Sequence, residues 1–107
     1  MSKEAQGNRP YRILVWGPGG LGTVCIWEAL NQAAFELVGV RCYSDGKVGT
    51  DAGDYVGLKP NGILFSNNID ELLALDADCV IYLALDMGVF HTDDEIFTIL
   101  KSGKHVI

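Results

Sequence analysis

A membrane-spanning helix needs an apolar run of about 20 residues. The longest apolar runs of this 107-residue chain are much shorter. Residues 1–10 are polar, without the apolar centre of a signal peptide. Basic residues are also few: eight Lys and Arg against fourteen Asp and Glu give a net charge of −6. Nucleic acids and anionic membranes select basic surfaces. The sequence therefore predicts a cytoplasmic protein that binds neither nucleic acid nor a membrane.

Cysteine and histidine are scarce as well. The three cysteines, Cys25, Cys42 and Cys79, are odd in number and lie inside apolar segments. The two histidines, His91 and His105, are not near them in sequence, and the spacing does not match a metal site. The expectation is reduced thiols in the core of an intracellular protein, and no metal.

The apolar segments that are present alternate with amphipathic or polar ones. Nearly continuous apolar runs at residues 12–16, 37–43, 62–65 and 77–84 predict strands buried on both faces, and a fifth begins at residue 105. Helices are predicted over residues 21–34, 69–76 and 95–103, with a single helical turn within residues 51–58. This alternation predicts an α/β fold with a doubly wound, Rossmann-like parallel sheet in the order 3-2-1-4-5.

Individual residues set the expected helix ends. Asn68 is a predicted cap for the helix over residues 69–76. Thr92, with Glu three residues later, forms a capping box at the start of the last helix. Gly103 is expected to end that helix in a left-handed conformation, with Lys101 and Lys104 beside its negative end.

The expected first helix begins directly after the first strand and a glycine turn. Within it, the apolar side chains of Val24, Trp27, Leu30 and Ala34 recur at helical spacing. This recurrence is the evidence that the segment is a helix.

The turn before this helix is dense in glycine, with the sequence GPGGLG at residues 17–22. Gly17, Gly19 and Gly22 form a GxGxxG pattern between a strand and a helix, which is the context of a dinucleotide site. The first glycine allows a sharp turn, the second admits a pyrophosphate, and the third lets helix and strand pack closely. Free N–H groups at the helix N-terminus then face the anion. The alternative is a turn with a purely structural role.

The end of the second strand bears on which dinucleotide is expected. An NAD site usually carries Asp or Glu about 20 residues past the glycines. This chain has Cys42 there, followed by Tyr43 and Ser44, and no carboxylate before Asp45. A carboxylate would repel a 2′-phosphate, so its absence permits NADP. The prediction is NADP, or NAD, with Cys42, Tyr43 and Ser44 around the adenosine ribose.

Nearby cations leave two interpretations open. Arg41 and Lys47 are candidates for holding a 2′-phosphate. Regular alternation along the strand, however, places Arg41 on the opposite face from Cys42, so a solvated Arg41 is an equal alternative. Tyr43 is a candidate for packing on adenine and, equally, for a simple aromatic at the rim.

The end of the fourth strand is the third expected contact region, because it lies across the switch point from the first strand. Ala84, Leu85 and Asp86 occupy it and are expected to line the nicotinamide half of the cofactor. Asp86 and His91 are the titratable residues of this loop. Neither has a reacting group in view, so no catalytic residue is assigned.

The glycine turn, LVGV, KVGTDAGDYVGL and LLALDADCVIY together carry a resemblance to a known group. From about residue 11 to residue 107, the chain resembles the N-terminal domain of the dihydrodipicolinate reductase-like superfamily. Within it, the chain is most similar to 2,4-diaminopentanoate dehydrogenases and native amine dehydrogenases. The segment GKVGTDAGDYVGL is the most specific part. Dihydrodipicolinate reductases usually carry one more residue between the second and last glycines, so the tighter GPGGLG favours the amine dehydrogenases.

The resemblance implies an NAD(P)-dependent oxidoreductase that moves hydride to or from the C=N or C–NH2 carbon of a small amine or imine. By position, it implies pyrophosphate binding by Gly17, Gly19, Gly20, Leu21 and Gly22. The family's substrate pocket and dimer contacts come largely from a C-terminal domain. We therefore expect a flexible lead-in at residues 1–10 and a dinucleotide-binding domain at residues 11–107. The longer protein is expected to form homo-oligomers, and this stretch alone to bind cofactor without turnover.

Two alternatives come from other classes of protein. A regulatory module could bind a dinucleotide and transmit redox state without catalysis, for instance to a DNA-binding domain. A methyl-transfer domain also uses a glycine turn after its first strand. It normally needs an acidic residue at the end of the second strand, so Cys42 counts against it.

Overall fold

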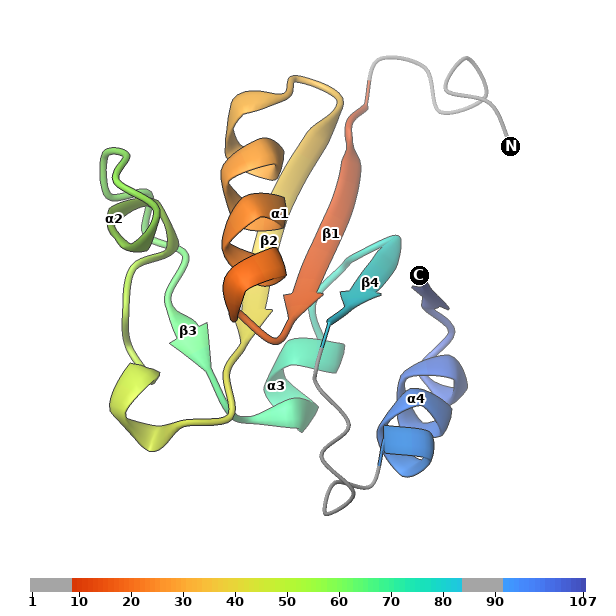
Figure 1. The fold of residues 1–107 in the computed structure, drawn as a ribbon. Helices are drawn as coiled ribbons and strands as arrows, with labels where there is room; N and C mark the ends of the chain where they lie inside the picture. The colour runs from red at the N-terminus through yellow and green to blue at the C-terminus, as the bar shows by residue number, and fades with distance from the viewer. Residues whose placement is uncertain (1–8, 84–91) are drawn as a thin grey trace.

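The computed structural model describes residues 9–83 and 92–107. Its centre is a five-stranded parallel sheet in the order β3-β2-β1-β4-β5 (Figure 1). This confirms the predicted doubly wound, Rossmann-like α/β fold. The strands are β1 (Tyr11–Trp16), β2 (Phe35–Arg41), β3 (Phe65–Ser66), β4 (Cys79–Tyr82) and β5 (His105–Val106). The helices are α1 (Gly20–Asn31), α2 (Ala52–Tyr55), α3 (Ile69–Leu73) and α4 (Thr92–Lys101), with a 3-10 turn η2 (Asp45–Lys47).

Strand β1 lies at the middle of the sheet and contributes to the core on both faces. Ile13 and Val15 pack into a cluster with residues of α1 and α2. Leu14 and Trp16 point the other way, into a cluster with residues of α3 and α4. A strand covered on both sides needs apolar residues on both faces, which is why residues 13–16 form a continuous apolar run.

Helix α1 packs on the sheet through its small and branched residues. Its buried residues are Gly22, Ile26 and Ala29, whereas Val24 and Trp27 are 56% and 44% exposed. The close approach of the helix to the preceding loop at Gly22 sets its rotation about its axis. Residues four and seven positions after Gly22 then face the sheet. Val24 and Trp27 recur at helical spacing but are exposed for this reason.

The predicted helix ends at Asn68 and Gly103 are confirmed, and Lys104 has a partner that was not predicted. The Asn68 side chain accepts a hydrogen bond from the Glu71 amide at 3.0 Å, which confirms the cap of α3. Gly103 has φ +90°, the left-handed conformation predicted after α4. The Lys104 ammonium, in contrast, donates to the carbonyl of Leu73 at 3.0 Å. Lys104 therefore stabilises the C-terminal end of α3 as well as following α4.

Several element boundaries differ from the prediction by a few residues. Strand β2 begins at Phe35 and ends at Arg41, and β3 begins only at Phe65. Gly62, predicted to begin β3, has φ +82° and so cannot continue a strand. Helix α4 begins at Thr92, earlier than the predicted residue 95. The side chains of the predicted capping box lie outside the described residues.

Candidate functional site

The glycine loop joins β1 to α1 at the carboxyl edge of the sheet. Strand β1 pairs with β2 on one side and with β4 on the other, so the order of the strands along the chain reverses there (Figure 1). Open α/β sheets bind ligands in the crevice at such a switch point. The loop therefore lies where a dinucleotide site requires it.

Two glycines of the loop are required by the fold itself. Gly17 has φ +102°, a conformation that other residues adopt only with strain. A Cβ at Gly22 would lie 2.1 Å from the carbonyl oxygen of Gly17, far inside van der Waals contact. These observations confirm the predicted sharp turn at the first glycine and the close packing at the last.

The other two glycines have no such structural reason. A Cβ built at Gly19 or Gly20 has no described atom within 4 Å, and neither residue has a positive φ. Gly19 has φ −73° and ψ −155°, which any residue can adopt. Among the residues that the structure describes, nothing covers the backbone here. Such a bare stretch is what close approach by an external group requires.

The same loop presents backbone donors. The N-cap Gly19 makes no side-chain cap bond, and the Thr23 amide donates the first helical hydrogen bond, to the Gly19 carbonyl at 2.8 Å. The amides of Gly20, Leu21 and Gly22 precede that bond. In the described parts of the chain, they have no acceptor. Together with the positive end of the dipole of α1, they form a potential anion site.

A second segment, far along the chain, contacts this loop. The phenol oxygen of Tyr55, at the end of α2, donates a hydrogen bond to the Pro18 carbonyl at 2.8 Å. The Tyr55 ring packs edge-on against Phe65, with 4.9 Å between ring centroids, and the Lys47 ammonium lies 5.6 Å from the Tyr55 centroid. Sequence reasoning did not find Tyr55. Its one signal was that it falls within the specific segment GKVGTDAGDYVGL.

Helix α2 is held in place by one carboxylate. Asp51 caps it by accepting from the amide of Asp54 at 3.1 Å, and it also accepts from the amides of Asn61 at 3.1 Å and Gly62 at 2.9 Å. These bonds, that from Asp54 foremost, hold the pKa of Asp51 below its ordinary value. The carboxylate thus joins the start of α2 to the chain leading into β3.

Cys42 lies in the core. It is 0% exposed and belongs to the cluster between the sheet and α1, and burial raises the pKa of its thiol. This confirms the predicted core thiol at Cys42. Its side chain has no exposed surface to offer the ribose. Of the three residues predicted around the ribose, Ser44 is exposed and Tyr43 is partly exposed.

Arg41 lies on the other face of the sheet from Cys42, as strand alternation predicts. Its guanidinium carbon is 3.9 Å from the centroid of the Tyr43 ring, and its Nη1 donates to the Cys42 carbonyl at 2.6 Å. Tyr43 packs against the cluster on the side of α3 and α4. The two cations near the end of β2 are therefore each placed over a tyrosine ring, Arg41 over Tyr43 and Lys47 over Tyr55.

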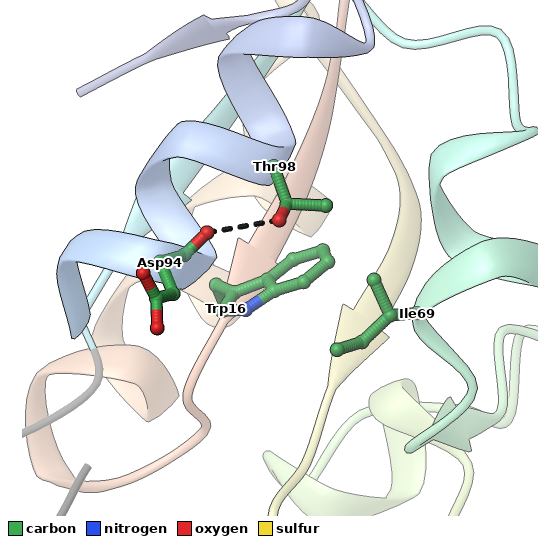
Figure 2. Close-up of a pocket in the computed structure, with 4 residues that line it drawn as sticks. All are labelled: Trp16, Ile69, Asp94 and Thr98. Carbon is green, nitrogen blue, oxygen red and sulfur yellow. Dashed lines mark hydrogen bonds between the residues drawn. The ribbon is translucent and has the colours of Figure 1, made fainter. Parts of the chain in front are cut away.

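A small cavity of about 110 Å³ lies between the sheet, α3 and α4 (Figure 2). It is lined by Trp16, the last residue of β1, by Ile69 of α3, and by Asp94 and Thr98 of α4. The Thr98 hydroxyl donates to the backbone carbonyl of Asp94 at 2.9 Å. The cavity is too small for a dinucleotide, but it adjoins the carboxyl end of β1.

A wider groove of about 730 Å³ lies on the sheet face towards α1 and runs across β1, β4 and β5. Its lining includes Tyr11 and Phe35, the first residues of β1 and β2, and Asp78, just before β4. These are amino ends of strands, so the groove reaches the edge opposite the glycine loop. Its size suits a ligand, but its position does not suit a dinucleotide at the switch point.

The predicted contacts at the end of the fourth strand, Ala84, Leu85 and Asp86, lie outside the described residues, as does His91. Among the residues that the structure describes, no group of three or more His, Cys, Asp or Glu side chains is placed to hold a metal ion. Within the same residues, no helix has both the length and the apolar character to cross a membrane.

Comparison with known proteins finds no matching family model and no matching curated protein. Solved structures do match. An amine dehydrogenase from Mycobacterium smegmatis has a TM-score of 0.73 and 26% identity, over 92% of this chain and 29% of that one. GenD2 from gentamicin A biosynthesis, in complex with NAD, has a TM-score of 0.69 and 20% identity, over 92% and 26%.

A third neighbour, RSP in complex with β-NADH, has a TM-score of 0.70 and 14% identity, over 95% of this chain and 46% of that one. Another structure of RSP describes it as a Rex-family repressor. The chain thus spans less than half the length of each of these proteins. The amine dehydrogenase and GenD2 agree with the resemblance to dihydrodipicolinate reductase-like nucleotide-binding domains.

Proposed function

We propose that residues 11–107 form an NAD(P)-binding domain whose glycine loop holds the pyrophosphate. One observation carries this proposal. Gly19 and Gly20 have no described atom within 4 Å of a built Cβ and no positive φ, so the fold does not explain why they are glycine. A ligand that approaches the backbone does explain it. The NAD of GenD2 and the NADH of RSP support a nicotinamide dinucleotide as that ligand.

With the pyrophosphate at the glycine loop, the other parts of the cofactor are proposed to lie at the ends of the neighbouring strands. Gly17, Gly19, Gly20, Leu21 and Gly22 surround the pyrophosphate. The adenosine ribose lies at the end of β2, against Tyr43 and Ser44, whereas the side chain of Cys42 is buried in the core. The absence of a carboxylate from residues 42–44 supports acceptance of NADP as well as NAD. Ala84, Leu85 and Asp86 remain the proposed contacts of the nicotinamide half.

The proposed chemistry is hydride transfer to or from the C=N or C–NH2 carbon of a small amine or imine. It is supported by the sequence resemblance and by the likeness to an amine dehydrogenase. This chain covers 29% of that neighbour. In the proposed arrangement, a further domain of a homo-oligomeric protein supplies the substrate pocket and the catalytic groups. Residues 11–107 then supply cofactor binding alone.

The test is a calorimetric titration of the purified chain with NADPH, NADH and S-adenosylmethionine. We expect both dinucleotides to bind and S-adenosylmethionine not to bind. The Gly19→Val variant should have the melting temperature of the wild type, because its Cβ meets no described atom. It should lose measurable dinucleotide binding, because the valine side chain would clash with the pyrophosphate. A folded chain that binds neither dinucleotide would overturn the proposal, and unchanged affinity in Gly19→Val would move the phosphates elsewhere.

A second candidate is a dinucleotide-sensing regulatory module without catalysis. The likeness to RSP, described as a Rex-family repressor, favours it. The full-length protein separates the two candidates. An enzyme would oxidise NAD(P)H when given a ketone or an aldehyde with ammonia. A sensor would show no such turnover, and NADH would change its affinity for DNA.

A further inference from the structure

The peptide bond between Pro18 and Gly19 has an orientation that is fixed from one side. Its carbonyl oxygen accepts the hydrogen bond from the Tyr55 phenol at 2.8 Å. The described chain has no cis peptide bond, so the C=O and N–H groups of this peptide point in opposite directions. The Gly19 N–H therefore points away from Tyr55 and α2. No acceptor for it lies among the described residues.

A peptide next to glycine rotates easily, because glycine has no Cβ to restrict its backbone angles. In this loop, Gly19 and Gly20 follow one another, and a Cβ added to either would have no described atom within 4 Å. Without an anchor, the Pro18–Gly19 peptide could turn its carbonyl oxygen towards the anion site, where it would repel a phosphate. The bond to Tyr55 opposes that rotation.

We propose that Tyr55 is a positioning residue of the dinucleotide site, whose phenol holds the Pro18–Gly19 peptide so that the Gly19 N–H faces the pyrophosphate. This inference rests on the proposed function of the loop. It gives α2 a part in cofactor binding. This helix belongs to GKVGTDAGDYVGL, the segment that is most specific for the family resemblance. Tyr55 acts through the backbone and does not itself touch the cofactor.

The phenol is well held for this role. The Tyr55 ring meets Phe65 edge-on at 4.9 Å, and Phe65 is 1% exposed in the core. Asp51 caps the helix that carries Tyr55, and the Lys47 ammonium lies over the ring. The hydroxyl is thus placed before any ligand arrives. Because the Tyr55 hydroxyl already holds the loop in place, none of the free energy of cofactor binding is used to order it.

A substitution can separate the contribution of the Tyr55 hydroxyl from that of its ring. Tyr55→Phe keeps the packing against Phe65 and removes only the bond to the Pro18 carbonyl. We expect the Kd for NADH and for NADPH to rise about fivefold, the size of one lost neutral hydrogen bond. Both should rise by the same factor, because the pyrophosphate is common to the two. Tyr11→Phe, at the amino end of β1, is the matched control and should leave both Kd values unchanged.

The experiment measures Kd by calorimetry and follows the backbone amide resonances of Gly19 and Gly20 by NMR. In Tyr55→Phe, the Gly19 resonance should broaden before ligand is added, because the peptide that carries this amide loses the anchor at its carbonyl oxygen. If Tyr55→Phe folds and binds both dinucleotides as the wild type does, the positioning role is wrong and the cofactor site stands. If the wild type itself binds neither, the proposed function fails instead.

Discussion

The phenol of Tyr55 and the carbonyl of Pro18 lie 2.8 Å apart, although 37 positions separate the two residues in sequence. This contact joins α2 to the loop between β1 and α1. The phosphate-binding loop of the proposed site is therefore supported from outside its own strand–turn–helix unit. The consequences for stability and cofactor choice can be tested at four further positions.

Gly22→Ala should destabilise the fold. The added Cβ would lie 2.1 Å from the backbone oxygen of Gly17, and neither backbone can move without separating α1 from β1. Overpacking of this kind costs about 1–3 kcal/mol, which lowers Tm by roughly 4–8 °C for each kcal/mol in a domain of this size. Thermal unfolding followed by circular dichroism measures the change. Gly20→Ala, whose Cβ meets no atom of the described residues, is the control and should melt at or above the wild-type temperature.

Cys42→Asp should also destabilise the protein and should not create an NAD-selective site. Sequence spacing marks residue 42 as the place for a ribose-binding carboxylate, but the residue is 0% exposed in the core. A carboxylate there loses its hydration, and burial already outweighs the nearby charges of Arg41 and Lys47 at the Cys42 thiol. Urea unfolding should show a lower midpoint than the wild type, and Cys42→Ala should lose much less stability. A Cys42→Asp variant as stable as Cys42→Ala would contradict the placement of this side chain.

Ser44→Asp is the substitution expected to change cofactor preference. Ser44 is exposed just after β2, so a carboxylate there stays hydrated and can meet the ribose. Like-charge repulsion should weaken NADPH binding by roughly tenfold relative to NADH, about 1.4 kcal/mol. Calorimetric titration of the variant with both cofactors gives the ratio, with Ser44→Asn as the uncharged control. An unchanged ratio would mean that the 2′-position does not lie near residue 44.

Asp51 should make the stability of the fold depend on pH in the acid range. Its pKa in the folded protein is held below the ordinary value by bonds from the amides of Asp54, Gly62 and Asn61. A group of this kind stabilises the folded state above its ordinary pKa of about 4. That contribution is lost as the pH falls through the lower folded pKa. The free energy of unfolding should therefore fall less steeply below about pH 4 in Asp51→Asn than in the wild type; parallel curves would show that Asp51 has no such role.

The sequence by itself determined the order of the strands, the parallel sheet and the place of the glycine turn. It also determined the Asn68 cap and the left-handed Gly103. These features depend on short-range patterns. A strand buried on both faces requires a continuous apolar run, a capping side chain reaches amides three residues ahead, and a positive φ favours glycine.

The tertiary structure alone decided which face of α1 is buried and that Lys104 reaches the end of α3. It alone brought Tyr55 to Pro18. Each of these depends on the distance between segments that are far apart in the chain. A periodic pattern shows that a helix has an apolar side, but the backbone contact between Gly22 and Gly17 sets how that helix is turned against the sheet.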